Sequence, residues 1–357
     1  MKILHVITDL KVGGESKHLA RAIPSLGAFD HVVSCLTVTT DPGGAPTNVR
    51  AEIEGFGVPV IDLGVSRKQP LSAARALLRL RGLARREKPD LVHSTLIHAN
   101  LLSEPLTWSG YPVICSHVLT DPWRRGWRRM LERCLGKRAI FIANSQAVAS
   151  SLVAGGLDRS RIRVLYYGVD TDHFRPEGHR SDHGRDEILL GVGRLDRQKG
   201  FADLIRAAAV LPNRMAVVLV GDGPLRESLS HRAKDLEVKL TIVPAVSDVA
   251  PYLRSASVVV LPSLYEGLPN VLLEALATCC AVVATDLPGH REVIRDGKNG
   301  LLVPPSDPAG LARTIDRALS DDGSLGAEGR RTVLERFGWE TYIERRRMLY
   351  ECVAAAA

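Results

Sequence analysis

Short runs of apolar, largely β-branched residues recur along the first half of the chain and alternate with segments of helical periodicity. Continuous apolar strands separated by helices are typical of a parallel sheet that helices cover on both faces. The first half therefore predicts one doubly wound α/β domain. Its expected strands are ILHVI (3–7), VVSCLTV (32–38), VPVIDL (58–63), LVHS (91–94), VICSH (113–117) and AIFIANS (139–145).

The same rhythm starts again in the second half and predicts a second domain of the same class. A polar stretch rich in Gly, His and Asp, without apolar periodicity, separates the two series and indicates a linker. We expect a Rossmann-like domain over 1–170, a linker over 171–187, a second Rossmann-like domain over 188–336, and a final helix over 337–357 that packs back on the first domain. The second series of strands is EILLGVG (187–193), AVVLVG (216–221), LTIV (240–243), SVVVLPS (257–263), AVVAT (281–285) and GLLVP (300–304).

Length and composition agree with this division. A chain of 357 residues with 45% hydrophobic and 24% charged residues suits two soluble domains. No stretch approaches the roughly 18 unbroken apolar residues of a membrane span. His5 and Asp9 interrupt the apolar start of the chain, which we interpret as a buried strand rather than a signal peptide, so a cytoplasmic protein is expected. The six cysteines have no zinc-like spacing and predict buried small side chains, without disulfide or metal.

Charge is distributed unevenly. Residues 1–180 hold 25 Lys and Arg against 16 Asp and Glu, a net charge of +9, whereas the remainder has a net charge of −2. The excess is concentrated in two segments, 75–88 and 123–138. Each segment is either a solvated helix face or a surface that attracts anionic lipid or an acidic acceptor. Nucleic acid is not an expected partner, because aromatics make up 5% of the chain and no known nucleic-acid module is present.

Two glycine-containing loops follow predicted strands and suit phosphate binding. GVGRLDRQKG (191–200) is not a dinucleotide fingerprint, because Asp196 stands where GxGxxG requires glycine. The loop instead offers Arg194 and Lys199 beside a helix start, a pairing that suits a diphosphate; ordinary surface cations are the alternative. After the first strand, Gly13 and Gly14 allow backbone N–H groups to approach an anion or sugar, or only form a tight turn.

The segment SLYEGLPNVLLEAL (263–276) places Glu266 and Glu274 on either side of a Gly-Leu-Pro-Asn turn. In one continuous helix, residues eight apart would be about 80° apart and separated by about 12 Å along the axis, so a close carboxylate pair is not expected. Pro269 favours a loop that carries Glu266 beyond the strand end, followed by a helix whose free N–H groups face a phosphate. Because ligands bind at the carboxyl ends of parallel strands, two facing sheets predict a cleft.

The chain resembles the retaining glycosyltransferases of family 4, which have the GT-B fold. The motifs that carry the resemblance are GRLDRQKG (193–200), LVGDGPLRESL (219–229), PSLYEGLPNVLLEALA (262–277) and ATDLPGHREVIRDGKNGLLVPPSD (284–307). Looser similarities are VGGESKHLA (12–20), KPDLVHSTLIHANLL (88–102) and YYGVDTDHFRP (166–176).

The resemblance implies roles for individual residues. Glu266 and Glu274 match the two acids of the E-x7-E motif, which contact the donor sugar and the nucleotide ribose, and Arg194 with Lys199 would clamp the diphosphate. The other donor-binding residues implied are Gly13, Gly14, Gly267, Leu268, Pro269 and Asn270. His117 matches the position whose imidazole contacts the transferred sugar and supports catalysis, although His93 and His98 compete for that role. His98 could also line the acceptor pocket, or simply pack or cap a helix.

Two departures from the family pattern concern the shape of the donor pocket. Thr278, Cys279, Cys280 and Ala281 stand where A-x-G-x-P is expected after the second acid, and Tyr167 replaces an asparagine. Neither change removes a charged contact.

The expected reaction is transfer of a hexose-type sugar from a nucleoside-diphosphate sugar to an acceptor hydroxyl, with retention at the anomeric carbon. No cofactor or metal is expected, because fixed cations neutralise the leaving group and no Asp-x-Asp follows a strand near these motifs. The product class would be bacterial cell-envelope glycan, glycolipid or glycosylated metabolite. A GT-B-fold epimerase or phosphorylase, or a non-catalytic nucleotide-sugar-binding protein, is the alternative.

The segment DPWRRGWRRMLERCLGKRA (121–139) predicts the acceptor side. Trp123, Arg124, Trp127 and Arg128 combine amphipathic rings with cations, which is typical of a lipid headgroup boundary. The resemblance offers the alternative that this is only the helix that precedes the next strand. Peripheral attachment to the inner face of the plasma membrane is therefore a hypothesis alongside a freely cytoplasmic protein.

Overall fold

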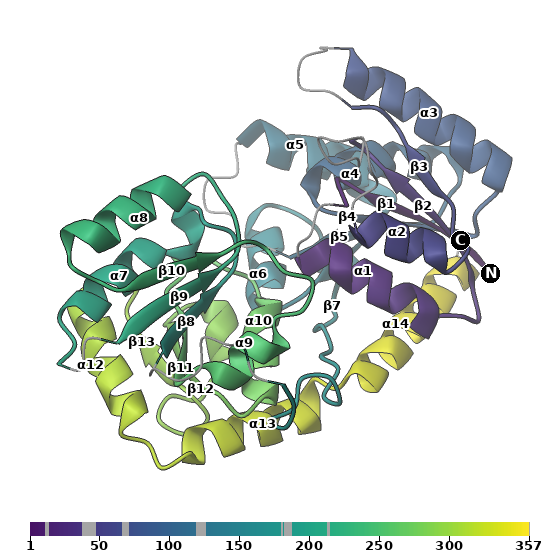
Figure 1. Ribbon diagram of the computed structural model, residues 1–357. Coiled ribbons are helices and arrows are strands. Elements are labelled where there is room, and N and C mark those ends of the chain that lie inside the picture. Colours follow the sequence, from purple (N-terminus) through teal and green to yellow (C-terminus); the bar gives the residue numbers. More distant parts are fainter. Residues whose placement is uncertain are drawn as a thin grey trace. The chain divides into compact units, whose positions relative to one another are not determined.

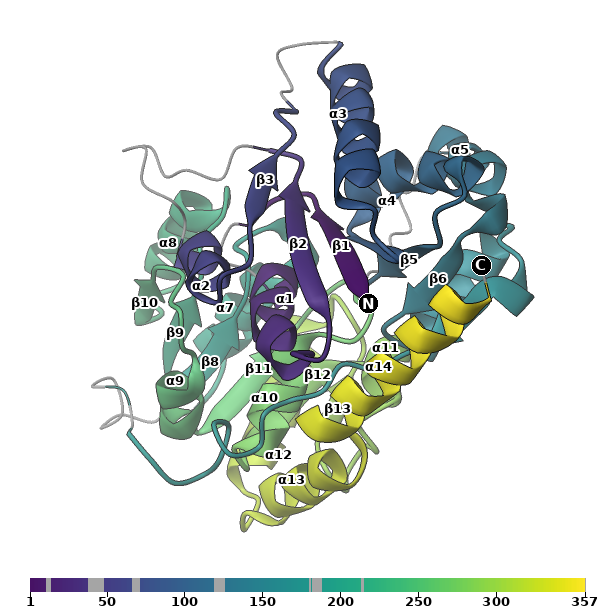
Figure 2. The same cartoon turned by 90° about the vertical axis from the view of Figure 1, so that its right-hand side faces the viewer.

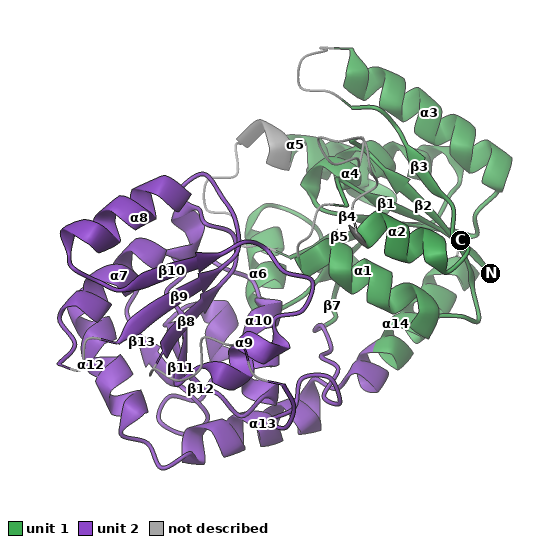
Figure 3. Cartoon of the chain, viewed as in Figure 1, with its two compact units in different colours: residues 1–118, 123–165, 343–357 green, residues 119–122, 166–342 purple. Residues whose placement is uncertain are grey.

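The computed structural model describes residues 1–10, 14–37, 48–65, 71–118, 126–179, 181, 188–212 and 215–356, without the side chains of 48 and 126–129. The chain divides into two compact units (Figure 3). Unit 1 consists of Met1–Val118, Trp123–Leu165 and Ile343–Ala357, and unit 2 of Leu119–Pro122 and Tyr166–Tyr342. Each unit is built on one parallel sheet, so the GT-B expectation of two doubly wound domains is confirmed.

Unit 1 has a seven-stranded sheet in the order β3-β2-β1-β4-β5-β6-β7, with helices between the strands (Figure 1). The strands are β1 (Lys2–Ile7), β2 (Asp30–Cys35), β3 (Val60–Asp62), β4 (Leu91–Thr95), β5 (Val113–His117), β6 (Ile140–Ala143) and β7 (Ile162–Val164). The helices are α1 (Gly14–Ser25), α2 (Asn48–Gly55), α3 (Ser72–Glu87), α4 (Ile97–Ser103), α5 (Gly126–Leu135) and α6 (Gln146–Ala154), with 3-10 turns η1 (Glu104–Ser109), η2 (Gly136–Arg138) and η3 (Arg159–Arg161).

Unit 2 has a six-stranded sheet in the order β10-β9-β8-β11-β12-β13. The strands are β8 (Ile188–Val192), β9 (Ala216–Val220), β10 (Leu240–Val243), β11 (Val258–Leu261), β12 (Ala281–Thr285) and β13 (Leu301–Val303). The turns and helices are η4 (Arg197–Lys199), α7 (Phe201–Ala209), α8 (Arg226–Asp235), α9 (Ala250–Ser255), α10 (Asn270–Ala277), α11 (Pro288–Arg291), α12 (Pro308–Leu319) and α13 (Ser324–Arg336).

The last helix, α14 (Trp339–Ala355), begins in unit 2 and continues into unit 1. In unit 1, its Tyr350 is fully buried, and the hydroxyl lies 2.5 Å from Nδ1 of His93 on β4. Arg346, one turn earlier, is also buried and donates to the same hydroxyl at 2.6 Å. The end of the chain is thus fixed to the sheet of unit 1 by polar contacts, and Figure 2 shows the helix in yellow.

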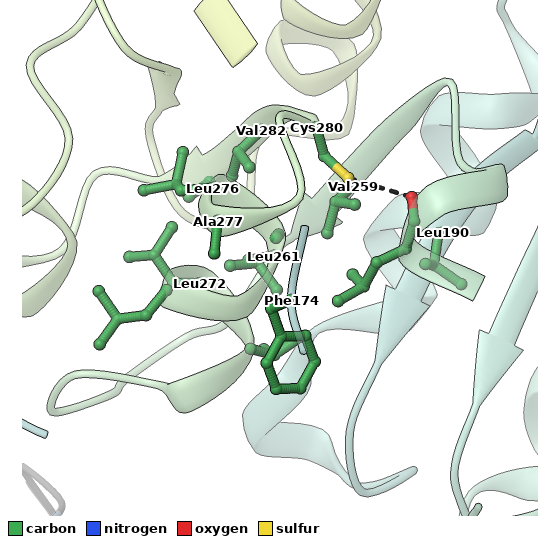
Figure 4. Close-up of a cluster of buried hydrophobic side chains, with 14 of the residues drawn as sticks. Phe174, Leu190, Val259, Leu261, Leu272, Leu276, Ala277, Cys280 and Val282 are labelled. Carbon is green, nitrogen blue, oxygen red and sulfur yellow. Dashed lines mark hydrogen bonds between the residues drawn. The ribbon is translucent and has the colours of Figure 1, made fainter. Parts of the chain in front are cut away.

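The strands of unit 2 are apolar on both faces because each face carries its own core. Leu190 and Val259 belong to one buried cluster, whereas their neighbours Leu189 and Val260 belong to the other. This alternation follows from the pleat, which directs successive side chains to opposite faces. Figure 4 shows the first cluster, onto which α10 packs Leu272 and its neighbours. The covered sheet fixes the strand ends from which the site is built.

Two details differ from the sequence-based expectation. Strand β7 was not predicted, because it has only three residues and its middle residue, Arg163, is exposed. The cysteines are unpaired, but Cys134 and Cys352 are exposed rather than buried; both lie on helices that have a solvent-facing side. In contrast, the helix predicted after Pro269 is present as expected and begins at Asn270.

Candidate active site

The loop after β8 holds Lys199 through local hydrogen bonds. Asp196 caps the short turn η4 by accepting a hydrogen bond from the Lys199 N–H at 3.3 Å. Gly200 follows with φ of +66°, and a Cβ there would lie 1.9 Å from the Pro262 carbonyl oxygen. Glycine is therefore required at this point, because it allows the loop to lie against the end of β11.

Two hydrogen bonds join this loop to the segment that follows β11. The Leu264 N–H donates to the Gln198 carbonyl at 2.8 Å, and the Gln198 amide donates to the Tyr265 carbonyl at 3.1 Å. The partners are about 65 residues apart in sequence. This connection brings the ends of β8 and β11 together and sets the distance between Lys199 and Glu266.

Lys199 and Glu266 form an ion pair at these strand ends. The Lys199 ammonium donates to Oε1 of Glu266, and the Ser263 hydroxyl donates to the same oxygen at 3.2 Å. Glu266 is only 5% exposed. A buried carboxylate needs such partners, because desolvation of an unpaired charge is costly. A ligand that draws Lys199 away must therefore offer Glu266 other donors.

Helix α10 begins immediately beyond this pair. Gly267, Leu268 and Pro269 are buried, and Pro269 occupies the N-cap position, where no side chain caps the helix. The first N–H groups of a helix have no partner within it and concentrate positive charge. A Cβ on Gly289 would lie 1.6 Å from the Gly267 carbonyl oxygen, so α11 supports this turn from behind. The turn and the ion pair together suit an anionic group with attached hydroxyls.

The structure does not group all the predicted donor residues. Arg194 is exposed, with 70% of its side chain accessible, and pairs with Asp196 at 2.5 Å. Glu274 is half-buried in the second turn of α10, and Asn270 is half-buried at its start. Lys199 and Glu266 are therefore the predicted pair that the structure shows in direct contact.

Three residues that sequence reasoning missed support Glu266. Besides Ser263, the Thr285 hydroxyl donates to the Ser263 carbonyl at 2.6 Å. His290 is fully buried, with Nδ1 at 2.6 Å from the Thr285 carbonyl, so the imidazole donates from Nδ1. Its Nε2 has no hydrogen-bond partner among the described residues. Burial lowers the pKa of His290, while the Thr285 hydrogen bond and the charge of Glu266 oppose this shift.

In unit 1, His117 lies at the carboxyl end of β5 and is buried. The Asn100 amide nitrogen is 3.2 Å from Nε2 of His117 and donates to the Ser116 carbonyl at 3.0 Å. An amide N–H can only donate, so Nε2 accepts and the neutral ring carries its proton on Nδ1. Asn100 was not predicted, although it lies in the same segment as His98.

The two competing histidines are placed differently. Both ring nitrogens of His93 are engaged, Nδ1 with Tyr350 and Nε2 with Ser116 at 2.7 Å. His98 is exposed on α4. His93 therefore serves to attach α14, and His117 is the histidine at a strand end.

The remaining predicted residues are less informative. Gly14 is exposed at the start of α1, whereas Gly13, Trp123 and Arg124 lie outside the described residues. Trp127 and Arg128 lie in the first turn of α5.

The comparisons with known proteins decide the family. Residues 12–173 match the family described as Glycosyltransferase Family 4, and residues 186–321 match that described as Glycosyl transferases group 1. The lipopolysaccharide core biosynthesis glycosyltransferase LpsE of Rhizobium meliloti is 30% identical over 352 residues, which cover 95% of this chain and 96% of LpsE. The chain belongs to the family 4 glycosyltransferases. A match over this length includes both units.

A second relative matches this glycosyltransferase over about half of its length. An N-acetylgalactosaminyltransferase of Campylobacter jejuni that acts on a diphospho-undecaprenol-linked sugar is 31% identical over 190 residues, about half of each chain. Among solved structures, HepE of Anabaena in complex with UDP-glucose has a TM-score of 0.86 at 20% identity, over 99% of this chain and 100% of HepE. Sucrose-phosphate synthase of Thermosynechococcus elongatus has a TM-score of 0.84 at 21% identity, covering both chains completely. These structures support the GT-B fold.

The described residues of the glycosyltransferase contain neither a membrane-spanning helix nor a cluster of metal ligands. None of the helices in the described part of the chain combines the length and apolar character that a membrane span requires. Over the same residues, no three His, Cys, Asp or Glu side chains are grouped to hold a metal ion.

Proposed function

We propose that this glycosyltransferase transfers a hexose-type sugar from a nucleoside-diphosphate sugar to an acceptor hydroxyl, with retention at the anomeric carbon and without a metal ion. The pairing of the partly exposed Lys199 with the buried Glu266, beside the uncapped start of α10, is the observation that carries the proposal. The site combines a cation and backbone N–H donors, which bind a diphosphate, with a carboxylate that accepts hydrogen bonds from sugar hydroxyls. The complexes of HepE with UDP and with UDP-glucose support this donor class.

Donor binding would change the partner of Lys199. In the structure its ammonium is bound to Glu266. A diphosphate brings more negative charge than one carboxylate, so Lys199 turns to it, and the sugar hydroxyls donate to the released oxygen of Glu266. Arg194 is exposed at the loop and can add a second cation. Glu274, further along α10, would accept from the ribose hydroxyls.

The chemical step follows from where charge develops. The bond between the anomeric carbon and the diphosphate oxygen breaks, and Lys199, Arg194 and the start of α10 stabilise the charge that grows on the leaving oxygen. That oxygen accepts the proton of the acceptor hydroxyl, whose oxygen forms the new bond on the same face of the sugar. Fixed cations thus supply the neutralisation that a divalent ion would otherwise provide, so activity should persist in EDTA.

A covalent intermediate is less well supported by the site. Retaining hydrolases place a free carboxylate nucleophile about 5 to 5.5 Å from a second carboxyl group. Here Glu266 is paired with Lys199 and accepts from Ser263, and Glu274 lies on the helix beyond the turn. His117, at the end of β5, is proposed to contact the transferred sugar, with Asn100 holding its ring.

The acceptor is proposed to belong to a bacterial envelope glycan or glycolipid. LpsE is named for lipopolysaccharide core biosynthesis, and the Campylobacter relative for an undecaprenol-linked substrate. Such acceptors favour peripheral attachment at the inner face of the plasma membrane. His98 and the segment with Trp123, Arg124, Trp127 and Arg128 stay predictions for the acceptor side.

A donor screen followed by product analysis tests the proposal. UDP-, GDP- and ADP-sugars are compared by thermal shift, because a ligand that binds only the folded state raises the melting temperature. The stabilising donor is then incubated with glycolipid acceptor, and the anomeric configuration of the product is read by NMR. Retention of configuration, with the rate unchanged by EDTA, is expected. An inverted product would contradict the mechanism, an altered donor sugar without acceptor would indicate an epimerase, and stabilisation without product formation would indicate a binding protein.

A further inference from the structure

Helix α3 exposes two leucines on its outward side. Leu71, at the N-cap, and Leu78 are 65% and 68% exposed, and they are the two most exposed large apolar side chains described in unit 1. The two leucines are seven residues apart, so in a helix they lie within about 20° of each other around the axis. Both views show α3 at the periphery of unit 1 (Figures 1 and 2). Exposed leucines that are aligned on one side of a helix indicate an interaction site more strongly than exposed leucines that are scattered over a surface.

Arginines flank the leucines on the same side. Arg75 and Arg85 are exposed and lie within about 60° of both leucines around the helix axis. Between residues 72 and 88 the chain has six Lys and Arg and one acid, Glu87. Glu87 lies on the opposite side of the helix and is paired with Lys2 and Arg86. The outward side of α3 is therefore apolar and cationic, without a carboxylate.

The rest of α3 is held in place by the fold. Its inward side buries Ala76, Leu80 and Leu83. Arg79 donates to the Leu63 carbonyl at 2.9 Å, and Arg81 donates to the Ser109 hydroxyl at 3.2 Å. These contacts fix the rotation of the helix, so the leucines cannot turn inward.

An exposed aromatic ring borders the same helix. Trp108 is 58% exposed and precedes Ser109, the residue that Arg81 contacts. Tryptophan is enriched at membrane interfaces, where its ring lies at the level of the lipid headgroups. The ring adds a third large apolar group to this part of unit 1.

We propose that this side of α3, defined by Leu71, Arg75, Leu78 and Arg85 and called the α3 face, docks on an anionic lipid surface. The inference deepens the proposed function, on which it rests, because a glycolipid acceptor is presented at such a surface. The arginines contact the headgroup phosphates, and the leucines enter the boundary between headgroups and acyl chains.

Lipid fits the α3 face better than other anionic or apolar partners. Nucleic-acid backbones would use the arginines and leave the leucines in water. A stable protein partner commonly covers about 800 Å² on each side, whereas the α3 face has only two exposed leucines to bury against it. Charge complementarity with interleaved apolar groups is instead characteristic of shallow, reversible attachment to anionic membranes.

The test is sedimentation of the full chain with lipid vesicles, without donor or acceptor. Vesicles of phosphatidylcholine with 30% phosphatidylglycerol are compared with phosphatidylcholine alone, at about 0.05 and 0.5 M salt, where screening differs strongly. We expect binding to the anionic vesicles only, and much weaker binding at high salt. The double variant R75Q/R85Q should bind about 25-fold more weakly, since each arginine contributes about fivefold. The variant L71S/L78S should lose at least tenfold.

The matched control changes two cations of unit 2, the half-buried Arg232 and the exposed Lys234. R232Q/K234Q removes two cations from α8 and should leave vesicle binding unchanged. The melting temperature and the donor-induced thermal shift are measured on every variant, so loss of folding or of donor binding is separated from loss of docking. Equal binding by R75Q/R85Q, equal binding to neutral vesicles, or no binding to either would overturn the α3 face as a lipid contact. Self-association abolished by L71S/L78S, or binding to an RNA oligonucleotide in place of vesicles, would assign it to another partner.

Discussion

Each unit of the enzyme contains a buried polar cluster, and the two are constructed differently. In unit 1, His5 and His93 are direct neighbours on β1 and β4, and His93 contacts Tyr350 and Ser116. Arg346 donates to Tyr350 and lies 3.1 Å from Nδ1 of His93. Because Arg346 and Tyr350 donate to Nδ1, the His93 proton lies on Nε2 and is donated to Ser116. This cluster lies under α14 on a sheet face and uses its hydrogen bonds internally.

The cluster of unit 2 lies at strand ends instead of on a sheet face. Lys199 and Glu266 form an ion pair beside the uncapped start of α10. Lys199 and Glu266 can replace their contact with each other by contacts with a ligand. The hydrogen bonds of the unit 1 cluster are all made within the protein, so a ligand could only disrupt them. A buried polar cluster on a sheet face therefore stabilises the fold, whereas a polar pair at the strand ends suits catalysis.

Removal of the unit 2 cation should have the largest effect. Lys199→Ala is expected to lower kcat/KM by about 10²- to 10³-fold, because a preorganised donor to the leaving group is lost. Initial rates with the donor found in the screen measure this, with circular dichroism to establish folding. Lys234→Ala, an exposed lysine on α8, is the control and should retain full activity. Near-normal turnover in a folded Lys199→Ala enzyme would remove Lys199 from the mechanism.

The corresponding change in unit 1 should affect stability instead. Arg346→Met deprives the Tyr350 hydroxyl and His93 of a buried donor, and should lower the free energy of unfolding by about 3 kcal/mol. Urea denaturation measures this effect. Arg345→Met, exposed on the adjacent position of α14, should change it by less than about 0.5 kcal/mol. Equal effects of the two substitutions would mean that the cluster does not attach the helix.

Acid should weaken unit 1 through its histidines. Burial lowers the pKa values of His5, His18, His31 and His93, and the charge of Arg346 lowers each further. His31 is partly compensated by its Leu26 hydrogen bond and Asp30, whereas Arg21 adds to the shift of His18. The unfolded chain, with histidine pKa values of about 6.5, binds more protons, so stability is complete above that pH and falls as pH decreases below it.

The dependence is measured from urea unfolding between pH 8 and pH 5. Each unit by which a histidine pKa is lowered corresponds to about 1.4 kcal/mol once the pH lies below the folded-state value. His93→Gln should reduce the slope of stability against pH, because one group no longer takes up a proton on unfolding. His231→Gln, exposed on α8, should leave the slope unchanged. An unaltered slope in His93→Gln would show that His93 does not contribute to the acid sensitivity.

The two clusters also show how far sequence reasoning extends. The sheets could be predicted because strands covered on both faces must be apolar throughout, and this signal is local. Lys199 and Glu266 could be singled out because each follows a predicted strand. Their direct pairing could not, since it depends on contacts of Gln198 with the segment after β11, about 65 residues away.

Supporting residues were missed for a related reason. Ser263 and Asn100 are polar residues without periodicity or spacing, and only the folded chain shows that Ser263 donates to Glu266 and that Asn100 contacts His117. His93 stayed a candidate for catalysis at the level of the sequence, because its contact with Tyr350, 257 positions away, is visible only in the folded chain. Tertiary hydrogen bonds of this kind leave no pattern in the local sequence.

The smallest expected effect concerns the end of α10, which supports the unit 2 cluster. Cys279 stands where the family pattern has glycine, and its φ of +57° is strained for a residue with a side chain. Cys279→Gly should therefore raise the free energy of unfolding by about 0.5 to 1 kcal/mol, after the greater freedom of glycine in the unfolded chain is subtracted. Urea denaturation of the variant measures the gain.

The neighbouring cysteine provides the matched control. Cys280 is buried, its φ is not positive, and its thiol donates to the Leu253 carbonyl at 3.1 Å, as the dashed line in Figure 4 marks. Cys280→Gly should lower the free energy of unfolding by about 2 kcal/mol, because it leaves a cavity in the core and relieves no strain. Destabilisation by both substitutions would show that the left-handed conformation at Cys279 is stabilised by its side chain. Opposite signs would show that glycine at this position serves the backbone alone, and that cysteine there lowers the stability of the helix end.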